Sequence, residues 1–112
     1  MTDNRNRRKS DRLHPLIPTR IKLKGTFFQL HDINNQGIGI ILENDGPQFV
    51  TGERIDSVPI PLQSGTVNIN GIVSHLSVTS KHRICGIRFL FNGDEFKSVI
   101  QFKNELLQPS PD

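Results

Sequence analysis

Two short groups of polar residues have types and spacings that suit the binding of a small anion. In the first, Arg8 and Arg12 are separated by three residues in a segment without a hydrophobic period. A guanidinium group grips phosphate with paired N–H donors, and its flat face stacks on an aromatic base. Two such groups can therefore hold a compact ligand from two sides. The alternative interpretation is that Arg7, Arg8 and Lys9 belong to a solvated basic tail.

The second group, Asp32, Asn34 and Gly37, falls where a predicted strand ends. A carboxylate accepts hydrogen bonds from the ring N–H and amino group of guanine, an amide donates and accepts at a base edge, and glycine lets backbone approach a ligand closely. The two groups together indicate a site for an anionic, purine-bearing small molecule. The second group also fits an ordinary turn, because Asx residues followed by glycine are typical of turns.

The positive charge of the chain is concentrated at its start. The formal net charge is +3; residues 1–12 hold five basic and two acidic side chains, and the remaining hundred hold nine of each. A general nucleic-acid binder spreads lysine and arginine over a face of the fold. The distribution of charge therefore indicates one local anion-binding segment, and we expect no nucleic-acid partner.

The sequence predicts that short strands carry the second polar group. From Leu16 onward, runs with period-two character alternate with turn residues, and short connections favour antiparallel neighbours. The predicted strands cover residues 17–24, 26–33, 37–42, 53–62, 66–76 and 83–91. Gly71 is expected to mark a bulge or a tight barrel corner. The pattern predicts an all-β fold, a six-stranded antiparallel β-barrel.

The hydrophobic period changes from two to 3.6 residues after Phe91, which predicts a C-terminal α-helix. Asn92 and Glu95 have the spacing of a capping box, and Pro109 ends the helix. The apolar stripe expected to cover one open end or side of the sheet consists of Phe96, Val99, Ile100 and Leu106.

The length of 112 residues fits one domain. We divide it into a flexible basic arm (residues 1–14), a barrel with its helix (residues 15–108) and a tail (residues 109–112). No apolar run reaches the roughly 18 residues that a membrane span needs, and no membrane association is expected. Cys85 is the single cysteine, so an internal disulfide is impossible, and a cytoplasmic location is expected.

With the surrounding strands, the two polar groups resemble the motifs of the PilZ domain, a bacterial receptor module for cyclic di-GMP. The family pattern Arg-x-x-x-Arg is similar to the run from Arg8 to Arg12, and Asp/Asn-x-Ser-x-x-Gly is similar to the run from Asp32 to Gly37. A later strand with Gly-x-x-Phe and a C-terminal helix also resemble that family. One position departs from the pattern, because Asn34 stands where the family usually has serine.

The resemblance implies an arm that folds over cyclic di-GMP, with the arginines on the phosphates and bases and the second group against a guanine. In this family the residue before the first motif arginine affects whether one ligand or an intercalated pair is held, and here it is an arginine. The ligand-binding residues so implied are Arg7, Arg8, Arg12, Asp32, Asn34 and Gly37. The resemblance further implies a non-enzymatic receptor without a cofactor that signals to a separate effector protein. We expect a monomer or a homodimer.

Catalysis is not indicated by the remaining polar residues. Four histidines are scattered without the spacing of metal ligands, and Cys85 has no evident partner histidine. The histidines are His14, His31, His75 and His82.

Two alternatives stay open at this point. One is a small barrel that binds RNA or single-stranded DNA on aromatic side chains. The expected aromatic platform is thin, because the sequence has no Trp or Tyr and only Phe27 or Phe28 is expected to face outward. The phenylalanines predicted to lie in the core are Phe89, Phe91, Phe96 and Phe102. The other alternative is a protein-interaction domain of the same fold that uses no nucleotide.

Overall fold

The structure, a computed structural model, describes residues 13–107, which form six strands and one helix. The elements are β1 (Arg20–Leu23), β2 (Thr26–Asn34), β3 (Gly37–Leu42), β4 (Arg54–Leu62), β5 (Gly65–Val78), β6 (Arg83–Phe89) and α1 (Glu95–Leu107). All six predicted strands and the helix are confirmed. The first strand is shorter than predicted, because Pro18 lacks the N–H that a continuous strand ladder needs.

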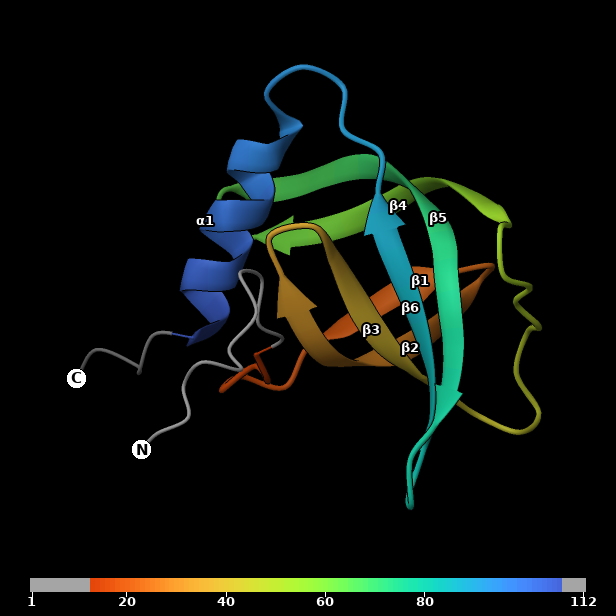
Figure 1. Ribbon diagram of the computed structural model, residues 1–112. Coiled ribbons are helices and arrows are strands. Elements are labelled where there is room, and N and C mark those ends of the chain that lie inside the picture. The colour runs from red at the N-terminus through yellow and green to blue at the C-terminus, as the bar shows by residue number, and fades with distance from the viewer. Residues whose placement is uncertain (1–12, 108–112) are drawn as a thin grey trace, which may run out of the picture.

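The strands form one antiparallel sheet in the order β1-β2-β3-β6-β5-β4. The sheet curls until its two edge strands, β1 and β4, lie against each other, which gives a nearly closed barrel (Figure 1). The predicted six-stranded antiparallel barrel is therefore confirmed. One consequence matters for the site: β3 pairs with β6, so residues about fifty positions apart become direct neighbours.

Alternate residues of the strands fill the barrel with aliphatic side chains. Ile69 and Val73 of β5 are buried, as the period-two pattern predicts, and so are Ile38 and Ile40 of β3. The residues between them lie on the outer face of the sheet. This alternation places Gly37 and Gly39 of β3 on the outer face.

Gly71 lies opposite a bulge, and the bulge belongs to the partner strand. Gly71 pairs with Ile55, and the register of β4 shifts between Ile55 and Val58. A Cβ at residue 71 would lie 2.7 Å from Cγ2 of Ile87, so a side chain there would displace a core residue. The expected irregularity is therefore present in β4, and close packing against β6 accounts for the glycine.

The helix packs against β4 with a stripe that differs from the predicted one. Val99, Phe102 and Leu106 are buried, whereas Phe96 and Ile100 are 42% and 38% exposed. The prediction was wrong for these two positions: residues 99, 102 and 106 share one side of the helix, and Ile100 is turned about 100° from Val99. The capping interaction is confirmed, since the Asn92 N–H donates to Glu95 Oε1 at 2.9 Å.

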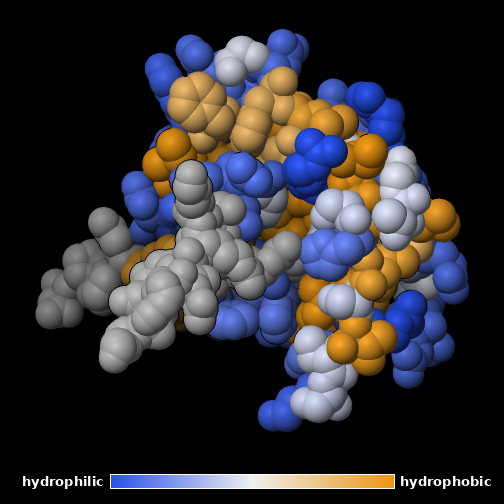
Figure 2. Space-filling model, in the orientation of Figure 1, coloured by the Kyte–Doolittle hydropathy of each residue, from blue (hydrophilic) through white to orange (hydrophobic). Residues whose placement is uncertain are grey.

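The predicted placement of the phenylalanines was also partly wrong. Phe28 is buried and Phe27 is exposed, which the sequence left open, but Phe91 and Phe96 are both partly exposed. Their rings contact each other near the start of the helix at 6.4 Å between centroids. Figure 2 shows hydrophobic side chains at the surface in this region. Within residues 13–107, no helix is long and apolar enough to cross a bilayer.

Candidate functional site

The chain enters the described region directly beside the second polar group. Leu13 forms an isolated antiparallel bridge with Ile33: each backbone N–H donates to the other residue's carbonyl oxygen at 2.9 Å. Ile33 lies between Asp32 and Asn34 in β2. A second backbone bond, from Leu16 N–H to the carbonyl of Leu106, ties the entering segment to the end of the helix at 2.9 Å. Leu13, the first described residue, is therefore held on β2 between Asp32 and Asn34.

The three predicted arginines belong to the part of the chain before this bridge. Arg7, Arg8 and Arg12 lie outside the described residues, so their roles stay predictions. The other three predicted residues, Asp32, Asn34 and Gly37, fall within β2 and the start of β3.

Asp32 is a buried charged residue with 4% of its surface exposed. The register of β2 shifts between Leu30 and Asp32, and this bulge sets the side chain on the outer face of the sheet. The carboxylate bonds to its neighbour, with His31 Nδ1 2.7 Å from Asp32 Oδ2. It also lies against Gly39, the residue opposite Asp32 in the register, since a Cβ at position 39 would be 2.6 Å from Oδ2. The bulge and the hydrogen bond with His31 thus fix the position of the carboxylate, and Gly39 leaves open the space that it occupies.

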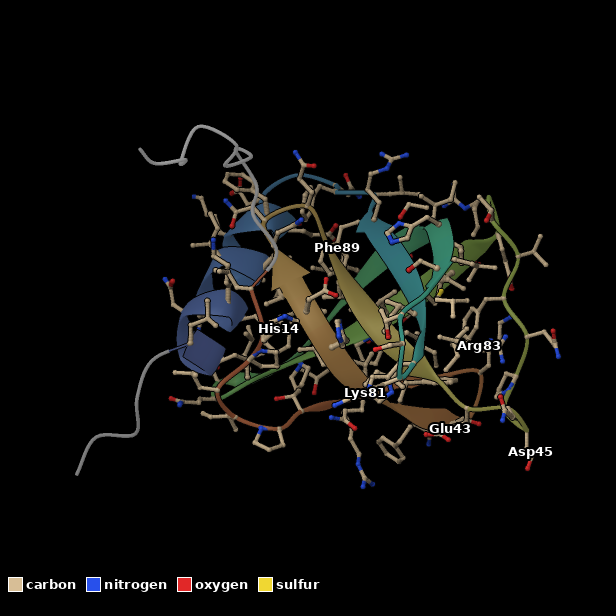
Figure 3. The ribbon with its side chains drawn as sticks, turned by 60° about the horizontal axis from the view of Figure 1, so that its bottom comes forward. His14, Glu43, Asp45, Lys81, Arg83 and Phe89 are labelled. Atoms are coloured by element: carbon tan, nitrogen blue, oxygen red, sulfur yellow. The ribbon has the colours of Figure 1, made fainter. Side chains whose placement is uncertain are left out.

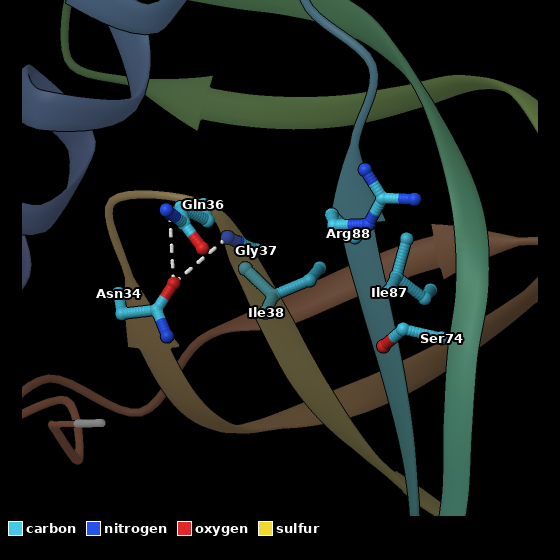
Figure 4. Close-up of a pocket in the computed structure, with 7 residues that line it drawn as sticks. All are labelled: Asn34, Gln36, Gly37, Ile38, Ser74, Ile87 and Arg88. Carbon is cyan, nitrogen blue, oxygen red and sulfur yellow. Dashed lines mark hydrogen bonds between the residues drawn. The ribbon is translucent and has the colours of Figure 1, made fainter. Parts of the chain in front are cut away.

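Asn34 has a structural role in the turn between β2 and β3. Its side-chain Oδ1 accepts hydrogen bonds from the backbone N–H groups of Gln36 and Gly37, at 2.7 and 2.9 Å (Figure 4). This confirms the turn interpretation of the second group for the oxygen of Asn34. Gly37 has a steric role as well, because a Cβ there would lie 2.2 Å from the carbonyl oxygen of Ile87.

A small pocket of about 80 Å³ connects this turn to β5 and β6 (Figure 4). Its lining residues are Asn34, Gln36, Gly37, Ile38, Ser74, Ile87 and Arg88. Arg88 is exposed and lies opposite Gly37 in the register. Neither Arg88 nor Ser74 was predicted as a site residue from the sequence. Arg88 stands between two apolar residues of a predicted strand, Ile87 and Phe89. This alternation predicts that its cationic side chain lies on the outer face of the sheet.

Three histidines that are far apart in the sequence lie together near Asp32. The ring of His31 is 4.9 Å from that of His14 and 6.2 Å from that of His82, and His14 Nδ1 bonds to the carbonyl oxygen of His31 at 2.8 Å. The fold thus brings together three histidines that are scattered along the sequence. No group of three or more His, Cys, Asp or Glu side chains within residues 13–107 could hold a metal ion.

A wider hollow of about 490 Å³ lies beside the β5–β6 hairpin. Figure 3 labels three residues of its lining, Glu43, Lys81 and Arg83. Lys81 and Arg83 line it together with Glu43, so its charges are mixed. Cys85 lies in the core, and burial raises the pKa of its thiol to about 11. A thiol that stays protonated at neutral pH is a poor nucleophile. Neither feature resembles a second small-molecule site.

The described part of the chain is thus a small antiparallel barrel with Asp32, Asn34 and Arg88 on the outer face of β2 and β6 and a helix packed against β4. No family model and no curated protein matches the chain. Among solved structures it is similar to the PilZ domain of YcgR from Escherichia coli with c-di-GMP, at 22% identity over 89% of this chain and 91% of that one, with a TM-score of 0.67. The fold is that of a PilZ domain, as the resemblance implied.

Two longer chains share the same fold. YcgR from Escherichia coli in complex with c-di-GMP is 20% identical over 89% of this chain, with a TM-score of 0.66. The inhibitor of motility MotI/DgrA from Bacillus subtilis is 18% identical over 88% of this chain, with a TM-score of 0.63. The similarity covers 46% and 50% of those two chains, so this chain spans about half of each.

Proposed function

We propose that this protein is a receptor for cyclic di-GMP, which it binds between the arm and the outer face of β2, β3 and β6. The observation that carries the proposal is the bridge between Leu13 and Ile33. Arg12 is the residue before Leu13 in the sequence, which supports a role for the arginine pair beside Asp32 and Asn34. Two of the similar structures hold c-di-GMP, which supports the same ligand here.

In this proposal each polar group has a defined role. The Asp32 carboxylate accepts hydrogen bonds from the ring N–H and amino group of a guanine, while the Asn34 amide and the Gly37 backbone meet the same base. Arg8 and Arg12 hold the phosphates and stack on guanine. Arg7 adds a further cation that favours an intercalated ligand pair. The reaction is binding alone, without catalysis or a cofactor.

Ligand binding is expected to order the arm, and this ordering is the signal. Each charge-assisted hydrogen bond contributes about 1.5–3 kcal/mol, whereas fixing the backbone costs roughly 1–2 kcal/mol per residue. A few such bonds offset the ordering of a short arm only when base stacking is added. The arm is therefore poised to order with the ligand, and a separate effector protein in the cytoplasm reads the ordered surface. The receptor acts as a monomer or homodimer, without nucleic acid or membrane as a partner.

Calorimetric titration with cyclic di-GMP and cyclic di-AMP tests the proposal. We expect saturable binding of the guanine ligand and at least about 10-fold weaker binding of the adenine ligand, because adenine has no ring N–H to donate to Asp32. Equal affinity for both ligands, or no binding of cyclic di-GMP, would contradict it. An oligonucleotide titrated at two salt concentrations separates the nucleic-acid alternative, since counterion release makes that binding steeply salt-dependent.

A second candidate is an interaction domain of the same fold that uses no nucleotide. One observation favours it: the Asn34 Oδ1 atom already accepts two backbone N–H groups of the turn. Absence of cyclic di-GMP binding by the whole chain, with the fold intact by circular dichroism, would support this candidate.

A further inference from the structure

Four residues form a straight row across the outer face of the sheet. Asp32 of β2 pairs with Gly39 of β3, Gly39 pairs with Gly86 of β6, and Gly86 pairs with His75 of β5. The row begins with the carboxylate of the proposed site and ends with an imidazole. The two positions between them are both glycine.

Both end residues extend toward the middle of this row. A Cβ at Gly39 would lie 2.6 Å from Asp32 Oδ2, and a Cβ at Gly86 would lie 2.2 Å from Cε1 of His75. Each polar side chain therefore occupies the space above its neighbouring glycine. Opposing Cβ positions on paired strands are about 4.5–5.5 Å apart. The carboxylate and the imidazole thus lie over two adjacent glycines, although their own strands are separated by two others.

The imidazole is held in this position by local structure. The register of β5 shifts between Val73 and His75, and the inserted residue is Ser74. Ser74 Oγ donates to the carbonyl oxygen of Gly86 at 3.1 Å and lies 3.2 Å from His75 Nδ1. A hydroxyl has one proton, so Ser74 accepts from His75 Nδ1–H when it donates to Gly86. The neutral ring then has Nε2 as a hydrogen-bond acceptor.

The surroundings of His75 suit a ligand better than a purely structural contact. The ring is partly exposed on the outer face, outside the aliphatic core. Ser74, which positions it, also lines the pocket that contains Asn34 and Arg88. An acceptor at one end of this surface complements the carboxylate at the other, and each can take the N–H donors of a guanine.

We propose that His75 contacts the second guanine of cyclic di-GMP, the one that Asp32 does not hold. This inference rests on the proposed function. A cyclic dinucleotide presents two identical bases, and the row presents one acceptor at each end. The ligand would then bridge β2 and β5 across the two glycines.

Variants of His75 test this inference by affinity. We expect His75→Ala to weaken binding of cyclic di-GMP at least about 10-fold, and His75→Gln, which keeps an acceptor, to stay within about 3-fold of the native chain. Asn68→Ala, at an exposed position of β5 outside the row, is the control and should bind like the native chain. Thermal unfolding without ligand confirms that each variant is folded.

The NMR signal of the His75 ring Cε1–H provides a direct readout of contact. It is expected to shift on addition of cyclic di-GMP and to stay in place with guanosine monophosphate, which offers one base. The variant Asp32→Asn shows whether the proposed site is used at all. If it weakens binding, then native-like affinity of His75→Ala or an unmoved His75 ring signal overturns the inference. A ring signal that shifts equally with both ligands also overturns it. Failure of the native chain to bind cyclic di-GMP contradicts the proposed function itself.

Discussion

The carboxylate of Asp32 fills the space that a side chain at Gly39 would need. A Cβ at residue 39 would lie 2.6 Å from Oδ2 and 2.9 Å from Oδ1 of Asp32. The two residues are paired across β2 and β3, and the bulge before Asp32 fixes which residue faces the glycine. The position of the acid therefore depends on a residue outside the motif that contains it.

The substitution Gly39→Ala should displace this carboxylate. We expect cyclic di-GMP affinity to fall by about 10-fold or more, and the free energy of unfolding to fall by about 1–3 kcal/mol, because the added methyl overpacks a close contact. Calorimetric titration and urea denaturation measure the two effects. Gly46→Ala is the matched control, since its Cβ would meet the Glu43 carbonyl oxygen at an ordinary 3.7 Å. Equal affinities of the two variants would argue against a ligand role for Asp32.

The arginines of the arm should matter for ligand binding and little for folding. We expect Arg8→Ala or Arg12→Ala to weaken cyclic di-GMP binding by roughly 10- to 150-fold. Each removes a charged contact to the ligand, so thermal stability without ligand should stay the same. Arg5→Ala removes the same charge outside the motif and serves as the control. Unchanged affinity in both motif variants would exclude the arm from the binding site.

The ion pair between Lys24 and Glu53 should give stability a small pH dependence. Lys24 Nζ lies 2.6 Å from Glu53 Oε2, and this hydrogen bond lowers the pKa of Glu53, against an opposing effect of burial. A lowered folded-state pKa stabilises the fold above the usual value of 4.5, and the contribution is lost as pH falls through the folded-state pKa. We expect Glu53→Gln to lower the free energy of unfolding by less than about 1 kcal/mol at pH 7, because the pair is partly exposed.

Urea denaturation of both proteins at several pH values checks this. The difference between them should shrink as pH falls below 4.5. A difference that grows on acidification would show that the pair does not stabilise the fold.

The observed helix stripe predicts different costs for two neighbouring positions. Phe102 is fully buried and Ile100 is 38% exposed. Phe102→Ala should lower the free energy of unfolding by about 3–5 kcal/mol, because it removes a buried ring and leaves a cavity. Ile100→Ala should cost less than about 1 kcal/mol, as is usual for surface substitutions. Similar costs for the two variants in urea denaturation would support the stripe expected from the sequence alone.

Local pattern was sufficient to predict the elements of this fold. The period-two hydrophobic pattern of the sequence identified all six strands, and the spacing of Asn92 and Glu95 identified the start of the helix. The turn at Asn34 was also recognisable, because its side-chain oxygen bonds to backbone two and three residues away. These features depend on neighbours in the sequence, which a single chain reveals.

Features that depend on pairing between distant strands were not predictable. The row from Asp32 to His75 requires the registers of three strand pairs and two bulges, and none of these is set by local sequence. Arg88 was missed for the same reason, since it meets Gly37 only through the β3–β6 pairing. The helix stripe was misjudged because 3.6-residue spacing allows two adjacent faces, and contact with β4 decides between them.

If cyclic di-GMP binds to the outer face of β2, β3 and β6, the backbone amide signals of the glycines on these strands report the binding. In an NMR titration with cyclic di-GMP, the signals of Gly37, Gly39 and Gly86 should shift and saturate. Those of Gly52, in the turn before β4, and Gly65, at the start of β5, should stay in place. Unmoved signals at Gly37, Gly39 and Gly86 in excess ligand, or shifts confined to Gly52 and Gly65, would show that the ligand does not bind to this face of the barrel.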